Sequence, residues 1–410
     1  MNGYGSVSFE KDINLTTTGT VQIIDQENRW DTDYLKVHLD NIDSGASLVI
    51  GYGPNANNPE IARYLSVTDS DINLKKHGVD NPNQLPLNAV FTGSGLHITG
   101  SIFAQAHIVK QEIPKWIQLT AAAAFPAREE FALQVLSIAG VQTMFLMGGL
   151  GAGAADLQDV WSSTDGITWA PQGVFPFSAR AGLKATVLNN KIIVAGGFDG
   201  SYKNDVYSFD GTTWTTLTAN AGWAIRGYFG MSVLNNIVYV YGGKNTGGYL
   251  DDVWKSVDGI TWTQVIAHSG FGLRSDFGYN DYQGRLWVAG GLKAGVLSNE
   301  VWSSSDGYTW VQASPTLAFP VRQSFPLKAF NKNKMPVLIA IGGVGTSVQF
   351  SDVYTSSDGQ AWQPYTTPSI DFSIRNGHQA IWMNNSIYMM GGINGSTLQN
   401  DVWRMSVPIV

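Results

Sequence analysis

Arginine recurs in the chain at a nearly constant distance after tryptophan, 11 to 13 positions by subtraction. The pairs are Trp116/Arg128, Trp169/Arg180, Trp214/Arg226, Trp262/Arg274, Trp310/Arg322 and Trp362/Arg375. A guanidinium group is a planar fork that grips carboxylates or phosphates through two parallel hydrogen bonds. If the fold brings these forks together, they form a site for acidic ligands.

A longer repeat carries these residues. The segment Asp159 to Trp169 reads Asp-Val-Trp-Ser-Ser-Thr-Asp-Gly-Ile-Thr-Trp, and variants begin at Asp205, Asp252, Glu300, Asp352 and Asp401. A Gly-Gly pair precedes each copy, at 148/149, 196/197, 242/243, 290/291, 342/343 and 391/392, so that first glycines are 48, 46, 48, 52 and 49 positions apart. A period of this length indicates one supersecondary unit per repeat, stacked or arranged radially.

Each repeat reads as four short strands. In the second copy, apolar residues alternate from Lys184 to Trp214, with Asn189-Asn190 and Asp210-Gly211 between the runs. Such pairs favour tight hairpin turns because Asn and Gly tolerate positive φ. Six units of four antiparallel strands predict an all-β, six-bladed β-propeller over residues 114–410.

The sixth repeat lacks its fourth strand, because Trp403 is followed by no Asp-Gly turn and no further tryptophan. Trp116 lies 12 positions before Arg128, as a fourth-strand tryptophan should. We therefore expect residues 115–119 to join the last blade as its outer strand, which closes the ring and removes an open edge.

The Gly-Gly pairs, the acidic-Val-aromatic strands and the fourth-strand tryptophans resemble the kelch family of β-propellers over roughly residues 115–410. The Ser-Thr-Asp-Gly-Ile-Thr-Trp segment is similar in part to the Asp-box of sialidase-like propellers, but is one residue shorter between Asp and Trp. The kelch resemblance implies that an arginine before strand one contacts acidic ligands. Arg226-Gly-Tyr-Phe-Gly fits that context best, and Arg128 and Arg322 fit it less well.

A meander places the loops between strands two and three and the blade-to-blade loops on one face. These loops are longer and more varied than the turns of the other face, and variable loops on a rigid scaffold usually carry binding. The candidate ligand-binding residues are Arg180, Arg226, Arg274, Arg322, Arg375, Trp223, Tyr228 and Tyr249, with Phe271 and Tyr279 as further candidates for stacking on sugars. The alternative is structural: each arginine pairs with an acid or a loop carbonyl of a neighbouring blade, and each aromatic ring packs locally.

Four acids near these arginines break the repeat: Glu129, Glu130, Asp276 and Asp281. They are candidate partners of the arginines, or a catalytic carboxylate pair of the kind that glycosidases use.

Residues 1–113 do not carry the repeat. Short β-like runs at 20–24, 35–39, 47–52, 63–68, 88–91 and 97–109 predict a separate β-sandwich-like domain, with a junction at Ile113-Pro114. The Pro-containing segments 55–59 and 81–86 are expected to be exposed loops. His97 and His107 are the nearest approach to a metal-ligand pair, and a surface or strand-lining role is the simpler interpretation.

Composition excludes several classes of function. A formal charge of -7 argues against general nucleic-acid binding, and the lack of cysteine rules out disulfides, thiolate metal sites and a copper-radical centre built on a Cys-Tyr cross-link. The first residues do not resemble a secretory signal. Residues 131–155 carry no charge, but their Gly-Gly register and polar breaks indicate the first hairpin of the propeller and not a membrane helix.

The low charge, the abundance of Asn, Thr and Gly, and a β-domain joined to a propeller are similar to bacteriophage tail or head fibre proteins. This resemblance implies a non-enzymatic virion component with no cofactor, which docks to other virion proteins through residues 1–113 and presents the propeller to a host-surface glycan or protein. A homo-oligomer is compatible with this role, and a chain of non-viral origin would be cytoplasmic. The alternatives are a sialidase-like carbohydrate-active hydrolase and a kelch-type interaction adaptor.

Overall fold

The computed structural model describes residues 116–314, 318–332, 335–365 and 372–406, together with the backbone of nine strands that precede them. The chain divides into two compact units, Met1–Ile113 and Pro114–Ile409. Each unit is described by itself.

The N-terminal unit contains two sheets. The first has the order β1 (Ile13–Leu15), β3 (Tyr34–Leu39), β8 (Gly95–Thr99) and β7 (Asn88–Thr92); the second has the order β6 (Asp71–Lys76), β5 (Ala62–Thr68), β4 (Ser47–Tyr52), β2 (Val21–Asp25) and β9 (Gln105–His107). The sequence did not predict β1 and β6. The backbones of His97 and His107 lie in different sheets, whereas their side chains and the loops at 55–59 and 81–86 lie outside the described residues.

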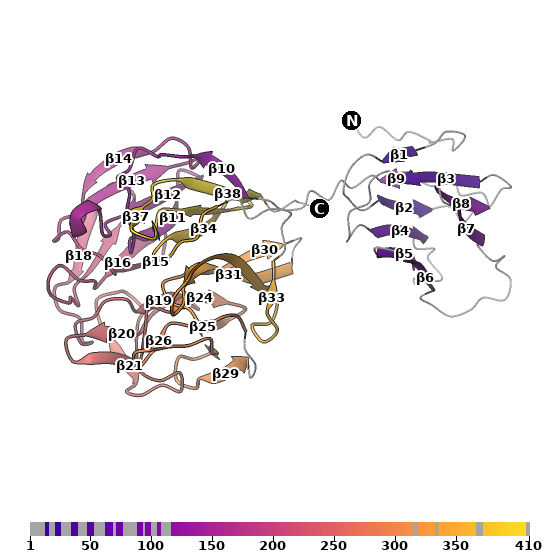
Figure 1. The fold of residues 1–410 in the computed structure, drawn as a ribbon. Helices are drawn as coiled ribbons and strands as arrows, with labels where there is room; N and C mark the ends of the chain where they lie inside the picture. Colours follow the sequence, from indigo (N-terminus) through magenta and orange to yellow (C-terminus); the bar gives the residue numbers. More distant parts are fainter. Residues whose placement is uncertain are drawn as a thin grey trace. The chain divides into compact units, whose positions relative to one another are not determined.

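The second unit contains six four-stranded antiparallel sheets, which we call blades 1 to 6 (Figure 1). Blade 1 is β11 (Ala132–Ile138), β12 (Val141–Met147), β13 (Asp159–Ser163) and β14 (Ala170–Val174); blade 2 is β15 (Lys184–Leu188), β16 (Lys191–Ala195), β17 (Val206–Phe209) and β18 (Trp214–Thr218); blade 3 is β19 (Gly230–Leu234), β20 (Ile237–Asn245), β21 (Gly248–Ser256) and β22 (Thr263–Ile266). Blade 4 is β24 (Gly278–Tyr282), β25 (Arg285–Ala289), β28 (Val301–Ser304) and β29 (Val311–Ser314); blade 5 is β30 (Leu327–Lys332), β31 (Met335–Val344), β32 (Gln349–Ser356) and β33 (Gln363–Pro364). The fold is all-β, as predicted.

Blade 6 combines the two ends of the unit. Its strands are β34 (Gln379–Met383), β35 (Ser386–Met390), β38 (Val402–Ser406) and β10 (Trp116–Thr120). β10 pairs antiparallel with β38, with Trp116 opposite Met405, and Figure 1 shows the purple β10 beside the yellow β38. The first strand of each blade contacts the first strands of both neighbouring blades, and β11 contacts β34 as well as β15.

The hairpin turns follow the sequence prediction. Asn189 and Asn190 both have positive φ, 48° and 54°, and Asn235-Asn236, Gln283-Gly284 and Asn384-Asn385 do the same. Residues 131–155 contain the β11–β12 hairpin, followed by one 3-10 turn, η1 (Ala152–Ala154), as their Gly-Gly register predicted. Within the described part of the chain, no helix is long and apolar enough to cross a membrane.

Short hairpins occupy several loops that the sequence left irregular. β26 (Leu292–Lys293) pairs with β27 (Val296–Leu297) and with β23 (Arg274–Ser275), and β36 (Ile393–Asn394) pairs with β37 (Thr397–Leu398). In blade 3 the second and third strands themselves extend outward until Asn245 pairs with Gly248. Several loops of this face, in blades 3, 4 and 6, therefore contain short β-hairpins.

The core lies between neighbouring blades. One cluster joins Phe145 of blade 1 to Leu183 and Phe209 of blade 2. Five similar clusters lie between the other pairs of neighbouring blades. Fully burying one such side chain contributes about 1.5–3 kcal/mol. Blade-to-blade packing is therefore the main source of stability.

The Gly-Gly pairs allow this close packing. Gly196 and Gly197 have φ of 60° and 102°, and a Cβ on Gly196 would lie 2.7 Å from Cε1 of Phe229 in the next blade. In five blades the residue three positions after the recurring arginine fills this place: Phe131, Phe229, Phe277, Phe325 and His378. Beside Gly148 the ring of Phe175 takes it instead of Leu183. His378 is the polar exception: it is buried, and the contact of its ring with the backbone of Ile341 does not have hydrogen-bond geometry, so that neither ring nitrogen has a well-formed partner.

We predict that His378→Phe stabilises the propeller by about 1–3 kcal/mol, because it removes unsatisfied buried polar atoms from a place that phenylalanine occupies in four other blades. Burial, and then the charge of Arg375, lowers the pKa of His378. The folded imidazole stays neutral while the unfolded one takes up a proton near pH 6.5, so stability decreases as the pH falls through that value.

The measurement is urea unfolding at pH 7.5 and 5.5, followed by tryptophan fluorescence, since 13 of the 14 tryptophans lie after residue 114. The stability difference between His378→Phe and the native chain should be larger at the lower pH. An equal or smaller difference at pH 5.5 would contradict a neutral, unpaired His378.

Candidate functional site

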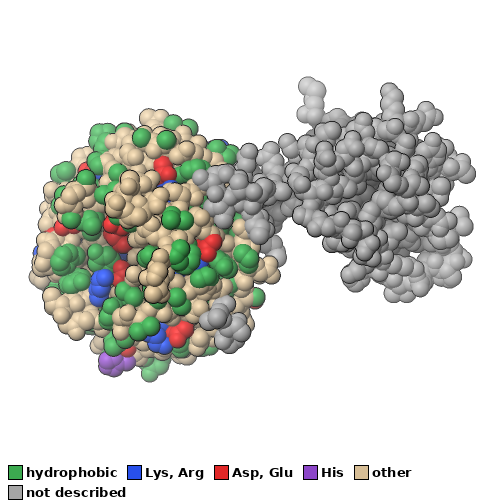
Figure 2. Space-filling model, viewed as in Figure 1, with side chains coloured by type: hydrophobic (Ala, Val, Ile, Leu, Met, Phe, Trp, Pro, Cys, Tyr) green, Lys and Arg blue, Asp and Glu red, His purple; other side chains and the backbone are tan. Residues whose placement is uncertain are grey.

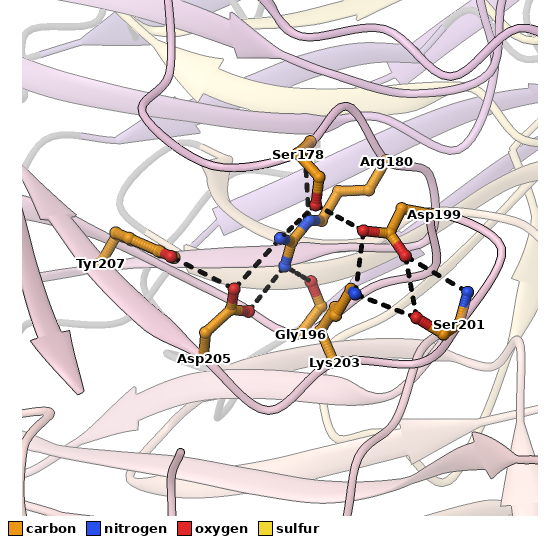
Figure 3. Close-up of polar contacts among 8 residues, drawn as sticks. All are labelled: Ser178, Arg180, Gly196, Asp199, Ser201, Lys203, Asp205 and Tyr207. Carbon is orange, nitrogen blue, oxygen red and sulfur yellow. Dashed lines mark hydrogen bonds and ion pairs between the residues drawn. The ribbon is translucent and has the colours of Figure 1, made fainter. Parts of the chain in front are cut away.

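The recurring arginines are internal clamps. Figure 3 shows Arg180, whose Nη1 and Nη2 donate to the two carboxylate oxygens of Asp205 at 2.6 and 3.1 Å, while Nη1 also donates to the carbonyl of Gly196 at 3.1 Å. Nε donates to the carbonyl of Ser178. The fork therefore joins the entry of blade 2 to its second and third strands.

The same contact is present in every blade. Two-bond forks join Arg128 to Asp159, Arg226 to Asp252, Arg322 to Asp352 and Arg375 to Asp401, and Arg274 donates to Glu300 at 2.5 Å. The acid is the first residue of the Asp-Val-Trp motif. It also accepts a bond from the aromatic residue two positions later, as from Trp161 to Asp159 at 2.7 Å.

Five of the arginines, all but Arg274, also bond to the preceding blade through their backbone carbonyls. The carbonyl of Arg180 accepts a hydrogen bond from Gly149 of blade 1, and the carbonyl of Arg128 accepts one from Gly392 of blade 6. The side chain is thus tied to its own blade and the backbone to the blade before it.

The expectation of a ligand-binding ring of guanidinium groups is therefore wrong. Arg226, Arg274, Arg322 and Arg375 are 0% exposed and Arg180 is 2% exposed, because a strand-three acid and a glycine carbonyl engage each fork. The arginines are structural, as the alternative predicted, but the pairing acid belongs to the arginine's own blade and not to a neighbouring one, and it is none of the four acids that break the repeat.

The aromatic candidates divide into two groups. Trp223 and Phe271 are buried in clusters between blades and cannot stack on a ligand. Tyr228, Tyr249 and Tyr279 are half-buried. Of the predicted binding residues, Tyr228 and Tyr249 thus retain accessible surface.

A second ring lies at the mouth of the channel, two positions after each arginine. Its members are Glu130, Gly182, Tyr228, Asp276, Ser324 and Gly377. Each N–H donates to the carbonyl of the member before it at 2.8 to 3.0 Å, and Glu130 donates to Gly377, so that the hydrogen bonds form a complete circle. All six residues have φ between 52° and 66°.

The left-handed backbone favours glycine and strains most other side chains. Gly182 and Gly377 therefore suit the ring, whereas Glu130 and Tyr228 adopt this conformation at a cost. Strained residues cluster at functional sites, where the surrounding structure holds them in place. We define the channel mouth as the six ring residues with Glu129 and Lys244, and take it as the centre of the candidate site.

Opposite charges meet at the channel mouth. Lys244 Nζ lies 3.0 Å from Asp276 Oδ2 and 4.1 Å from the centre of the Tyr228 ring. Burial alone would lower the pKa of Lys244, but Asp276 more than offsets it and the pKa is raised. In Figure 2, Lys or Arg and Asp or Glu side chains lie side by side on the propeller surface among mostly uncharged groups.

The two adjacent glutamates hold protons more tightly than exposed ones. Burial, and then the charge of Glu130, raises the pKa of Glu129 to about 7. Burial also raises the pKa of Glu130, although Lys184 opposes that shift. Of the four acids that break the repeat, Glu129, Glu130 and Asp276 thus belong to the channel mouth, while Asp281 lies further along strand β24.

Sequence reasoning missed Lys244, Lys184 and Lys328. The first belongs to the extended second strand of blade 3, and the others to first strands, where most equivalent positions carry uncharged residues. Their departure from the repeat is the signal that identifies them. The described residues contain no group of three His, Asp or Glu side chains arranged to hold a metal ion.

Comparisons with known proteins agree with this architecture. A kelch motif model matches residues 179–219 and 225–255, and the model of the DUF6242 beta propeller domain matches residues 269–407. Among solved structures, one titled "Structure of YjhT" has a TM-score of 0.57 at 15% identity, covering 70% of this chain and 97% of that chain. No curated protein matches. The matches support a kelch-type propeller.

We predict that Arg375→Met destabilises the propeller by about 3–5 kcal/mol, because it leaves Asp401 buried without its partner. Arg128→Met is the matched variant, since both arginines form a two-bond fork and lie near one phenylalanine ring. Its cost should be smaller, because Asp159 is 26% exposed and Asp401 only 8%, so water screens the abandoned charge better. Urea unfolding measures both, and equal or reversed costs would contradict this ranking.

Proposed function

We propose that this chain is a non-enzymatic binding protein. The propeller presents its loop face to a host-surface protein or glycan, while residues 1–113 anchor the chain to a larger assembly such as a virus particle. In this proposal the six blades form one closed kelch-like ring, with β10 as the closing strand.

Five exposed aliphatic side chains on loops of different blades, which we call the aliphatic arc, carry the proposal. Ile225, Leu273 and Ile374 each directly precede a clamp arginine and are 40%, 43% and 44% exposed. Val296 and Val348, at the tips of loops in blades 4 and 5, are 70% and 52% exposed. We infer that they form one surface in the complex, because exposed apolar area with a polar surround is typical of sites that bind another macromolecule.

The scaffold beneath the arc is rigid. Ile225, Leu273 and Ile374 are each joined by a peptide bond to an arginine whose guanidinium group is bonded within its own blade. A pre-organised surface loses little conformational freedom on binding, which favours affinity. The aliphatic character of the arc favours a protein partner, whereas Tyr249 and Tyr228 offer rings for a sugar.

A carbohydrate-active hydrolase is the second candidate, because Glu129 has a raised pKa, as a general acid requires, and lies next to Glu130. Under the binding proposal, the chain releases neither reducing sugar nor free sialic acid from bacterial or animal glycans. Release that disappears in Glu129→Gln would establish the hydrolase instead.

We predict that Leu273→Asp/Ile374→Asp weakens binding to the chain's ligand at least about tenfold, because charge replaces buried apolar contact at the interface. The matched control is Ile167→Asp/Ile260→Asp, since these residues are 53% and 52% exposed in turns of the opposite face. The measurement is surface binding of the full chain to panels of bacterial outer-surface proteins and of neutral and acidic surface glycans.

Equal losses in the two double variants, or a loss in the control alone, would contradict a binding site on the loop face. Mass spectrometry of purified virus particles tests the anchoring role separately. Absence of the chain from particles would reject the virion assignment and leave the loop-face experiment unaffected.

A further inference from the structure

A small cavity lies in the channel behind the mouth. Its volume is about 30 Å³, which holds roughly two water molecules. Strands of different blades contribute its polar lining: Lys184 from β15, Tyr279 from β24, Lys328 from β30 and Gln379 from β34. None of these side chains takes part in the arginine clamps.

The cavity contains hydrogen-bond donors that have no acceptor. Within the described residues, neither Lys184 nor Lys328 forms an ion pair or a hydrogen bond, and the same ranges contain no hydrogen bond from the Tyr279 hydroxyl or the Gln379 amide. The two ammonium nitrogens lie 5.7 and 5.8 Å from the centre of the Tyr279 ring. Two cations that share one ring repel each other unless an anion lies between them.

The nearby carboxylates do not supply that anion. Asp276 is engaged by Lys244 at 3.0 Å and by the Ser275 hydroxyl at 2.6 Å. Glu130 attracts Lys184 and Asp281 attracts Lys328, but in the described part of the chain no carboxylate forms an ion pair with either lysine. The positive charge of the lysine pair is therefore compensated only in part.

We propose that this cavity binds one oxyanion group, a carboxylate or a phosphate, between Lys184 and Lys328. The Tyr279 hydroxyl and the Gln379 amide donate further hydrogen bonds to it. His378 lines the cavity with two unpaired nitrogens, which adds polar surface without charge. Since the cavity accepts only a few atoms, the remainder of a larger ligand lies in the channel.

The charge of Lys328 makes this site sensitive to pH. Burial, and then repulsion from Lys184, lowers the pKa of Lys328 to about 8, while Asp281 opposes the shift. Burial also lowers the pKa of Lys184, with Glu130, Asp276 and Lys244 as the charges around it. An anion binds the protonated lysines, so affinity should decrease as the pH rises through about 8.

Isothermal titration of the full chain with sodium acetate and, separately, with sodium phosphate tests the site at pH 7. We expect saturable binding of at least one anion and a loss of about tenfold or more in Lys184→Met and in Lys328→Met. Lys328→Arg retains the charge and should remain within about threefold of the native affinity. Lys191→Met is the control, because Lys191 is an exposed lysine at a turn, outside the cavity.

The bound anion should also bind more weakly at pH 9 than at pH 7; for acetate the probe itself does not change charge between these values. No saturable binding of either anion, or native affinity in Lys328→Met, would overturn the proposal. Lys328→Arg changes the same side chain but preserves its charge. If it binds the anion as the native chain does, a loss in Lys328→Met reflects the missing charge and not the substitution at this position. The loop-face experiment uses other residues, so failure here leaves the proposed function standing.

Discussion

The contact between a buried arginine and the acid of the third strand is the interaction on which the propeller depends. A guanidinium group removed from water must be paired, and each fork finds a carboxylate, a glycine carbonyl and a carbonyl near its own residue. Because the arginine backbone also bonds to the preceding blade, the same residue fixes the fold of one blade and its position against the next.

The ring of backbone hydrogen bonds at the channel mouth follows from this arrangement. The residues two positions after the arginines meet around the channel and bond in a circle. The repeat requires a left-handed backbone at these positions but leaves their side chains free. The repeat is therefore broken at Glu130, Tyr228 and Asp276, and Lys244 contacts both Asp276 and Tyr228.

The sequence predicted features that depend on local chemistry. The residue types of Asn189-Asn190 predict a hairpin turn, and the Trp116/Arg128 spacing predicted the strand that pairs with β38. The prediction for the arginines was wrong because it considered acids close to them in the sequence. The true partners are distant in the sequence: Asp205 lies 25 positions after Arg180, and Asp159 lies 31 positions after Arg128. An acid that recurs with every arginine was the overlooked signal.

Other features could not be predicted in this way. Glu and Tyr rarely adopt a positive φ, so their residue types did not predict the ring at the channel mouth. The cavity lysines belong to the first strands of blades 2 and 5, which are far apart in the sequence. Only the fold brings both to the same cavity. His378 likewise became recognisable only when the glycine-pair contact showed that phenylalanine fills the equivalent place elsewhere.

Hydrogen exchange of the six ring amides tests the central claim most directly. If clamped blades close the ring, the amides of Glu130, Gly182, Tyr228, Asp276, Ser324 and Gly377 should exchange slowly and at similar rates, because they open only when the whole propeller opens. In Arg375→Met all six should exchange faster together. Fast or unrelated exchange of individual ring amides in the native chain would contradict a closed ring held by the arginine clamps.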